Sequence, residues 1–235
     1  MEGLHPEERP HGRVSKGEGA GANGPGRYAV IKIAFDEAIA RVIVRKIAPL
    51  GVSPNLVTTL VLLLGIAAGL MLASGERWAM HVGAGLFMLA MLFDHVDGNL
   101  ARATGKTSAF GHYYDHVAMA TTYTAMFIGV GVGHSQGFLG LYALPLGVLA
   151  GLSVAAIFST RIGVEVKAGK DYVKQPRFLG FEPEDTLYVV GPIMWLGWMP
   201  YFLIAAGIGT PIFLFYVIWQ SRRQVADAAR KQETK

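Results

Sequence analysis

Residues 93–119, FDHVDGNLARATGKTSAFGHYYDHVAM, place three carboxylates inside or against long apolar segments. Asp94 and Asp97 stand near the end of one apolar segment, and Asp115 stands near the start of the next. A charged residue at the centre of a membrane helix costs ~2.5–3.5 kcal/mol on insertion scales, so three such residues need compensation. Carboxylates inside membranes find it in cations, metals or water-filled cavities, and this stretch therefore marks a candidate site.

The chain around this stretch has the composition of a membrane protein. Of its 235 residues, 52% are hydrophobic and 16% are charged, whereas an ordinary soluble domain carries about 25% charged residues. The absence of cysteine excludes disulfides, thiolate catalysis and cysteine-based zinc sites. A helix needs about 20 mostly apolar residues to cross the hydrocarbon. We therefore expect an all-α integral membrane protein with six transmembrane helices, at 54–74, 79–100, 110–133, 138–160, 186–204 and 207–222.

The regions around these spans divide the chain further. Residues 1–26 are rich in Gly, Pro, Glu and Arg, which predicts a flexible tail. Residues 27–50 combine apolar residues at helical spacing with interrupting charges, which predicts an amphipathic interfacial helix before the spans. The transmembrane catalytic domain should comprise residues 51–224, followed by a cytoplasmic tail at 225–235. Within it, we place the boundary between the last two spans near AAGIGTP, residues 205–211.

Lysine and arginine are distributed unequally about the six predicted spans. Twenty of the 21 fall on one side, in the N-terminal region, the loops after the second and fourth spans, and the C-terminal tail. The opposite side holds Arg77 alone. By the positive-inside rule, both termini and residues 93–119 should face the cytoplasm.

The three acids should meet in space. Asp94 and Asp97 are three residues apart, which places them on one face of a helix. Asp115 begins the next helix, which we expect to be antiparallel and adjacent because the connection is short. Three carboxylates that converge near the interface make an all-oxygen site suited to Mg²⁺, Mn²⁺ or Ca²⁺. Their charge requires a cation, and a metal is the simplest one.

The spacing of these acids continues into a longer pattern that resembles the signature of the CDP-alcohol phosphatidyltransferase (phosphotransferase) family, D-x2-D-G-x2-A-R-x8-G-x3-D-x3-D. Every fixed position except the last is matched. The resemblance implies transfer of a phosphoryl-alcohol group, in particular a phosphatidyl group, from a CDP-linked donor to an acceptor alcohol with release of CMP, in phospholipid biosynthesis. It also implies a homodimer that uses a divalent metal, Mg²⁺ or Mn²⁺. The matching residues are Asp94, Asp97, Gly98, Ala101, Arg102, Gly111 and Asp115.

The resemblance assigns a role to each matching residue. The three acids, Asp94, Asp97 and Asp115, would be the metal ligands. Arg102 would clamp the diphosphate, a task that suits its planar guanidinium. The CDP moiety would approach the backbone where a larger side chain would hold it off, at Gly98, Ala101 and Gly111.

The sequence departs from the signature at Met119, where the family has a final aspartate that acts as base toward the acceptor hydroxyl. Methionine can neither accept a proton nor replace a carboxylate ligand. His112 and His116 flank Asp115 on the same helix, and either is a candidate replacement base. Their i, i+4 spacing also makes them candidate metal ligands, which would favour Zn²⁺ or Mn²⁺. His95 adds a third imidazole to the neighbourhood.

Other interpretations remain open at this point. An acceptor that is already ionised, or that the metal activates, needs no protein base. Alternatively, the chain is a catalytically impaired relative that binds a CDP-lipid and metal without turnover. A cation transporter fits less well, because transporters place such residues near the membrane midplane. The compact size favours a prokaryotic inner membrane, and the sequence leaves the donor and the acceptor open.

Overall fold

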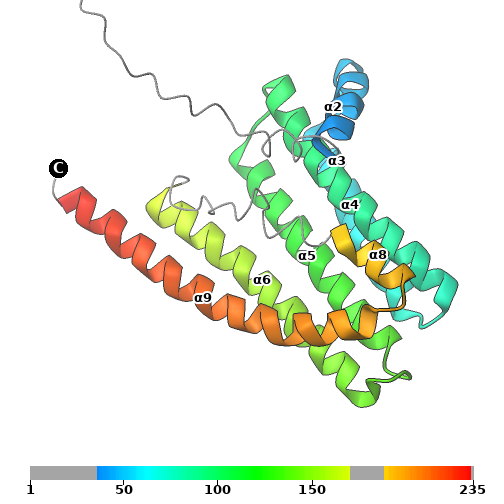
Figure 1. Cartoon of the computed structure of the whole chain (residues 1–235). Helices are drawn as coiled ribbons and strands as arrows, with labels where there is room; N and C mark the ends of the chain where they lie inside the picture. Colours follow the sequence, from blue (N-terminus) through cyan, green and yellow to red (C-terminus); the bar gives the residue numbers. More distant parts are fainter. Residues whose placement is uncertain (1–35, 170–187, 234–235) are drawn as a thin grey trace, which may run out of the picture.

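The structure of the chain is a computed structural model that describes residues 36–169 and 188–233 (Figure 1). Helices make up most of these two ranges, and no strand occurs within them. The all-α class is therefore confirmed for the described part of the chain. The elements in order are α2 (Asp36–Ile47), η1 (Ala48–Leu50), α3 (Pro54–Ala73), α4 (Arg77–Thr104), α5 (Ala109–Gly133), η2 (Gly140–Tyr142), α6 (Ala143–Ala168), α8 (Val190–Trp195) and α9 (Met199–Glu233).

Four helical segments within the described residues are long and apolar enough to cross a membrane. They are α3, α4, the segment Gly140–Ala168 that contains η2 and α6, and the segment Met199–Arg230 of α9. α5 has 25 residues and occupies the predicted third span, yet it is not among these four. The membrane-crossing architecture is therefore supported, and the count of six spans stays a prediction.

The predicted boundary between the last two spans is wrong. The stretch at 205–211 lies inside α9, which accommodates Pro211 as membrane helices often do. The helix break comes earlier, between α8 and α9, at residues 196–198. The predicted span 186–204 is therefore not one helix, and α8, with six residues, is too short to cross a membrane.

Local backbone chemistry explains where the chain breaks. Gly197 has a φ of 76°, the left-handed conformation that glycine adopts readily at the end of a helix. The N–H of Trp198 donates to the carbonyl of Ile193 over 2.9 Å, and the N–H of Gly197 donates to the carbonyl of Met194 over 3.0 Å. These two bonds form a Schellman motif that ends α8. Pro200 then stands in the first turn of α9, where its missing N–H costs nothing.

Two helices continue further than the sequence predicted. The fourth span was expected to end at residue 160, before a solvated loop, but α6 continues to Ala168. α9 continues to Glu233, past the expected domain boundary at 224. The extension of α6 matters for the site, because it carries Glu165 to the end of the bundle where α4 turns into α5.

α3 packs against both α4 and α5, while α4 and α5 make few direct contacts. The expectation that α5 lies directly beside α4 is therefore wrong. Glycines allow α3 and α5 to approach closely: a Cβ on Gly69 would lie 2.7 Å from the carbonyl oxygen of Ala125, and Gly65 faces Thr122. Gly147 of α6 packs on the opposite side of α5. These small residues thus serve packing within the chain, as is common where helices meet in lipid.

α2 covers the end of the bundle that carries the acidic stretch (Figure 1). Its buried Ala40 and Val44 pack against Val57 of α3 and against Val96 and Leu100 of α4. This cluster joins the start of α3 to the last turns of α4, which carry the first two acids. α6 and α9 pack side by side, and their C-terminal ends point to the same side of the bundle in Figure 1.

Candidate functional site

The acidic stretch forms the end of α4, a short turn and the start of α5. α4 ends at Thr104, and Gly105 takes a φ of 67°, which lets the chain leave the helix. Ser108 caps α5, because its hydroxyl accepts a hydrogen bond from the backbone N–H of Gly111 over 2.9 Å. Residues 105–107 are thus a turn that sets the end of α4 and the start of α5 at the same end of the bundle.

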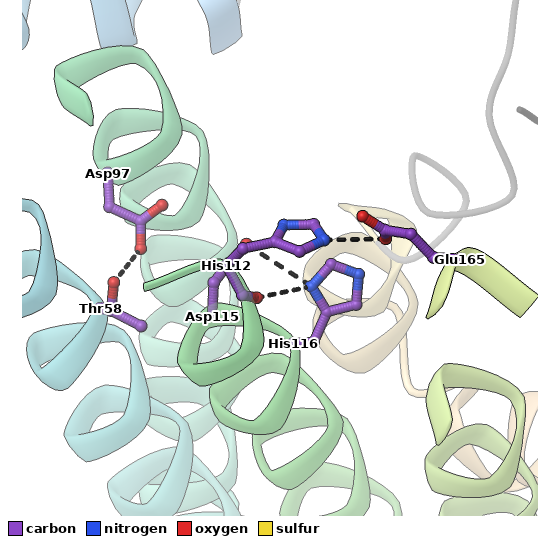
Figure 2. Close-up of polar contacts among 6 residues, drawn as sticks. All are labelled: Thr58, Asp97, His112, Asp115, His116 and Glu165. Carbon is purple, nitrogen blue, oxygen red and sulfur yellow. Dashed lines mark hydrogen bonds and ion pairs between the residues drawn. The ribbon is translucent and has the colours of Figure 1, made fainter. Parts of the chain in front are cut away.

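Asp94, Asp97 and Asp115 lie together at this end. Each offers one carboxylate oxygen, and these oxygens lie within 4.8 Å of one another. Asp97 is the most buried of the three, with 4% of its surface exposed. Thr58 of α3 donates a hydrogen bond to its Oδ2 over 2.6 Å (Figure 2). α3 therefore helps to position an acid that α4 contributes.

The three carboxylates fit a divalent cation. Oxygen ligands of this kind suit Mg²⁺, Mn²⁺ or Ca²⁺. Oδ1 of Asp115 is buried and has no hydrogen-bond partner among the described residues, so it is available to a ligand. Like charges this close disfavour one another's ionised forms unless a cation neutralises them. The residues present therefore fit a bound metal ion.

A cavity of about 820 Å³ opens beside the acids. Asp97 and Asp115 line it, and Arg102 and Lys106 add positive charge to its wall. Its volume lies in the range of small-molecule sites, about 300–1,000 Å³. The residues that the resemblance assigned to the CDP moiety all line this cavity: Gly98, Ala101, Arg102 and Gly111.

Gly98 and Gly111, both in the wall of this cavity, differ in their surroundings. A Cβ on Gly98 would lie 3.5 Å from Nη1 of Arg102, which is an ordinary contact. The Arg102 guanidinium thus lies next to Gly98, and its Nη2 donates to Oδ1 of Asn99 over 3.1 Å. A Cβ on Gly111 would lie 3.0 Å from Oδ1 of Asn55 and 3.1 Å from Oγ of Ser108, so a larger residue there would require these side chains to shift. At Gly98 the fold has room for a methyl group.

His112 and His116 lie one turn apart on α5, with ring centroids 4.5 Å apart. Nε2 of His112 is 2.8 Å from Oε2 of Glu165 on α6 (Figure 2). Nδ1 of His116 is 3.0 Å from the backbone oxygen of His112 and 4.0 Å from Oδ2 of Asp115. His112 lines the polar cavity, whereas His116 lines an apolar groove of about 600 Å³ among α3, α5 and α6.

Met119 and His95 have other surroundings. Met119 is 6% exposed and belongs to the main hydrophobic core together with Tyr123. Nδ1 of His95 is 3.0 Å from the carbonyl oxygen of Met91 and 3.5 Å from the hydroxyl of Tyr188. Of the three imidazoles near the acids in sequence, the structure thus brings two together and places the third beside Tyr188.

Sequence reasoning missed two residues of this region. Thr58 lies in an apolar span, where its hydroxyl gave no sign of the contact with Asp97. Glu165 lies beyond the predicted end of the fourth span at residue 160, and no local pattern ties it to His112, which stands 53 positions earlier.

Comparisons with known proteins agree with the fold and the motif. A model of the CDP-alcohol phosphatidyltransferase family matches residues 51–220. No curated protein matches the sequence significantly. Among solved structures, the phosphatidylinositol phosphate synthase of Mycobacterium tuberculosis, in complex with manganese and citrate, is similar with a TM-score of 0.57. The two sequences are 20% identical, and the match covers 77% of this chain and 88% of that chain, which shows a shared fold.

Proposed function

Because the chain belongs to the CDP-alcohol phosphatidyltransferase family, we propose that it transfers a phosphoryl-alcohol group, in particular a phosphatidyl group, from a CDP-linked donor to an acceptor alcohol and releases CMP. The reaction would belong to phospholipid biosynthesis. One observation carries the proposal: Asp94, Asp97 and Asp115 meet beside a cavity that also has cationic residues in its wall. Attack on a diphosphate requires neutralisation of its negative charge, and such a site is built for that task.

Asp94, Asp97 and Asp115 are the proposed ligands of Mg²⁺ or Mn²⁺. A metal held there would neutralise the diphosphate as CMP departs. The chain's own contribution is to hold the acids in place, and the hydrogen bond from Thr58 to Asp97 serves this purpose. The manganese in the similar solved structure supports the choice of metal.

The CDP moiety is proposed to bind in the cavity beside the acids. Gly98 and Ala101 leave its wall open for a close approach of the nucleotide. Arg102 would hold the diphosphate through charge-assisted hydrogen bonds, and Lys106 would add charge at the cavity wall. Gly111 also lines this cavity, and a side chain there would displace those of Asn55 and Ser108.

The acceptor hydroxyl must lose a proton as it attacks the phosphorus, and Met119 cannot take it. We propose that His112 and His116 together supply the function of the missing aspartate. They flank Asp115 on α5, and His112 lines the cavity where the reaction would take place. Histidine is the side chain most often used for this task near neutral pH.

A second candidate function is binding of a CDP-lipid and metal without turnover. The position of Met119 favours it, because this apolar side chain is buried in the core where the family's base would stand. Such a protein would keep metal-dependent nucleotide binding and would release no CMP. The two candidates therefore differ in one measurable product.

The arrangement in the membrane is also a proposal. We place both termini and the site on the cytoplasmic face, because 20 of the 21 lysines and arginines fall on that side of the predicted spans. The membrane itself is proposed to be a prokaryotic inner membrane. α2 would lie in the interface as the described part of the amphipathic segment 27–50. The protein would act as a homodimer, as the family resemblance implies.

The test is CMP release by the purified full chain in lipid nanodiscs. The donor is CDP-diacylglycerol, offered with a panel of acceptor alcohols and with Mg²⁺ or Mn²⁺, beside the variant Asp97→Asn. Asp227→Asn serves as the matched control, because it makes the same chemical change at an exposed position of α9. We expect metal-dependent release that Asp97→Asn abolishes and Asp227→Asn leaves unchanged.

The possible results separate the two candidates. Metal-dependent CDP binding that Asp97→Asn removes, with no CMP release from CDP-diacylglycerol and any of the acceptors, would favour binding without turnover. Release that proceeds equally in Asp97→Asn would contradict the proposed role of the three acids.

A further inference from the structure

A second group of metal-binding side chains lies next to the three acids. We propose that His112, His116 and Glu165 form a transition-metal site, with Zn²⁺ as its preferred ion, separate from the Mg²⁺ or Mn²⁺ site of the acids. The binding of this metal does not depend on the proposed transferase activity. Only its role in that activity rests on the proposed function.

The geometry of the three side chains suits one ion. Each offers one ligand atom, and these atoms lie within 4.8 Å of one another. Nε2 of His112 and Oε2 of Glu165 are already 2.8 Å apart. Two ligands that sit about 2.0–2.2 Å from a zinc ion are roughly 3 Å or slightly more apart, so small side-chain rotations admit the ion. The two histidines come from one face of α5, and the carboxylate comes from α6 (Figure 2).

The hydrogen bonding of His116 prepares it as a ligand. A backbone carbonyl can only accept, so the 3.0 Å contact between Nδ1 of His116 and the oxygen of His112 requires a proton on Nδ1. In the neutral ring, the lone pair then resides on Nε2. Metal-binding histidines typically donate their second ring N–H to a carbonyl or carboxylate in this way, which fixes the tautomer and the ring orientation.

The donor set distinguishes this site from the neighbouring acids. Two imidazoles and one carboxylate are the protein ligands of many catalytic zinc sites, which keep the fourth position open. Three carboxylates instead favour Mg²⁺, Mn²⁺ or Ca²⁺. The sequence HYYDH at 112–116 also has the order histidine, two residues, acid, histidine that one class of zinc enzymes shows as H-x-x-E-H. That pattern alone is weak, and Glu165 supplies the third ligand that it needs.

The site is open on one side and enclosed on the other. The His112 side chain is 40% exposed and Glu165 15%, and both line the polar cavity where the nucleotide is proposed to bind. His116 borders the apolar groove instead and packs edge-on against Phe158, with ring centroids 6.2 Å apart. A hydroxyl group can therefore reach the site from the cavity, next to Asp115.

At this position the metal could promote deprotonation of the acceptor hydroxyl, which Met119 cannot do. A zinc ion lowers the pKa of a hydroxyl group that binds to it, so that the group can lose its proton near neutral pH. The histidine pair would then take the place of the family's final aspartate through the ion that it holds, and the proton lost by the acceptor hydroxyl would pass to solvent through the cavity that His112 lines.

Zinc binding by the tag-free full chain in nanodiscs tests the proposal. The protein is stripped with a chelator and titrated with Zn²⁺ against a chromophoric competitor, and Co²⁺ is added separately to record the visible spectrum of the bound ion. We expect one tight Zn²⁺ per chain. Since loss of a supporting residue around a metal typically costs 10–100-fold in affinity, loss of a ligand in Glu165→Gln or His116→Ala should cost at least as much.

Two controls separate this site from others in the chain. His134→Ala removes the histidine that directly follows α5, whose Nδ1 also lies 3.0 Å from the carbonyl four residues earlier, but which is outside the group of three. Asp97→Asn disables the neighbouring acids. Zn²⁺ affinity should be unchanged in both, and the thermal transition of each variant shows whether it is folded.

The results bear differently on the two proposals. Zn²⁺ affinity that is unchanged in folded Glu165→Gln and His116→Ala would overturn the zinc site, as would loss of Zn²⁺ in Asp97→Asn. Tight Zn²⁺ binding without CMP release would uphold the site while the transferase proposal fails. CMP release that survives removal of all Zn²⁺ at full rate, with Mg²⁺ present, would overturn the role in activation.

Discussion

The acids on α4 and α5 and the histidine–glutamate group on α5 and α6 lie side by side, yet they differ in how they are assembled. Asp94, Asp97 and Asp115 stand within one short stretch of sequence and are joined by a single turn. Glu165 reaches His112 from 53 positions further along the chain. The first group can be recognised from spacing, whereas the second exists only because α6 packs against α5. The family motif and the two histidines beside it can thus be recognised without the structure, but their contact with Glu165 cannot.

Asp115→Asn should have the largest effect on CMP release, because it removes the charge of one of the three proposed metal ligands. It leaves the group of His112, His116 and Glu165 intact. Loss of a metal ligand worth several kcal/mol of transition-state stabilisation corresponds to roughly 10³-fold in CMP release. Zn²⁺ affinity should be unchanged, since Oδ2 of Asp115 is 4.0 Å from Nδ1 of His116, beyond hydrogen-bond distance. Parallel measurement of both quantities in the same preparation tests whether the two groups are independent. Loss of Zn²⁺ together with activity would mean that they form one site.

Glu165→Gln should lower CMP release by roughly 10²-fold, the lower end of the contribution of proton transfer in enzymes. The dependence of the remaining rate on Mg²⁺ concentration should stay that of the unmodified protein, because the three acids are untouched. Glu165→Asp is the matched variant, since it keeps the charge with a shorter reach, and it should retain more activity than Glu165→Gln. Equal rates in all three proteins would show that the glutamate has no part in turnover.

Thr58→Val should weaken Mg²⁺ binding by roughly 10-fold, because residues that support metal ligands contribute 10–100-fold in affinity. The change keeps the side-chain shape and removes the hydroxyl that donates to Asp97 over 2.6 Å. The measurement is the Mg²⁺ concentration that gives half-maximal CMP release. Thr59→Val, one position along α3, removes a hydroxyl that contacts Tyr114 instead and serves as control. An equal shift in both variants would point to a general change in α3.

Gly98→Ala should have the smallest effect of these variants. It should leave the stability of the fold almost unchanged and still weaken binding of the CDP-linked donor. A methyl group there meets Arg102 at an ordinary distance, and alanine is favoured over glycine in a helix by up to about 1 kcal/mol. The thermal transition should therefore stay the same or rise slightly, while the KM for the CDP-linked donor increases severalfold. An unchanged KM would mean that the nucleotide does not approach the backbone at this residue.

Much of the fold followed from local physical chemistry. The apolar segments at 54–74 and 79–100 became α3 and α4, because membrane helices satisfy their backbone groups internally and need only length and apolar side chains. The predicted boundary between the last two spans was wrong because the helix break lies at Gly197 and Pro200. A glycine and a proline at that spacing end one helix and begin another. Glycine and proline at 207–211 look like a stronger break, but a surrounding helix bundle tolerates them.

What the sequence by itself determined is the meeting of the three acids, because i, i+3 spacing and a short turn confine these side chains to one place. The cavity residues beside them were expected from the family resemblance alone. What only the tertiary structure decided is their support and their neighbours. Thr58 reaches Asp97 because glycines let α3 pack between α4 and α5. Glu165 reaches His112 because α6 continues for two more turns beside α5. Contacts between distant parts of a chain depend on how whole helices pack, and no local pattern encodes that packing.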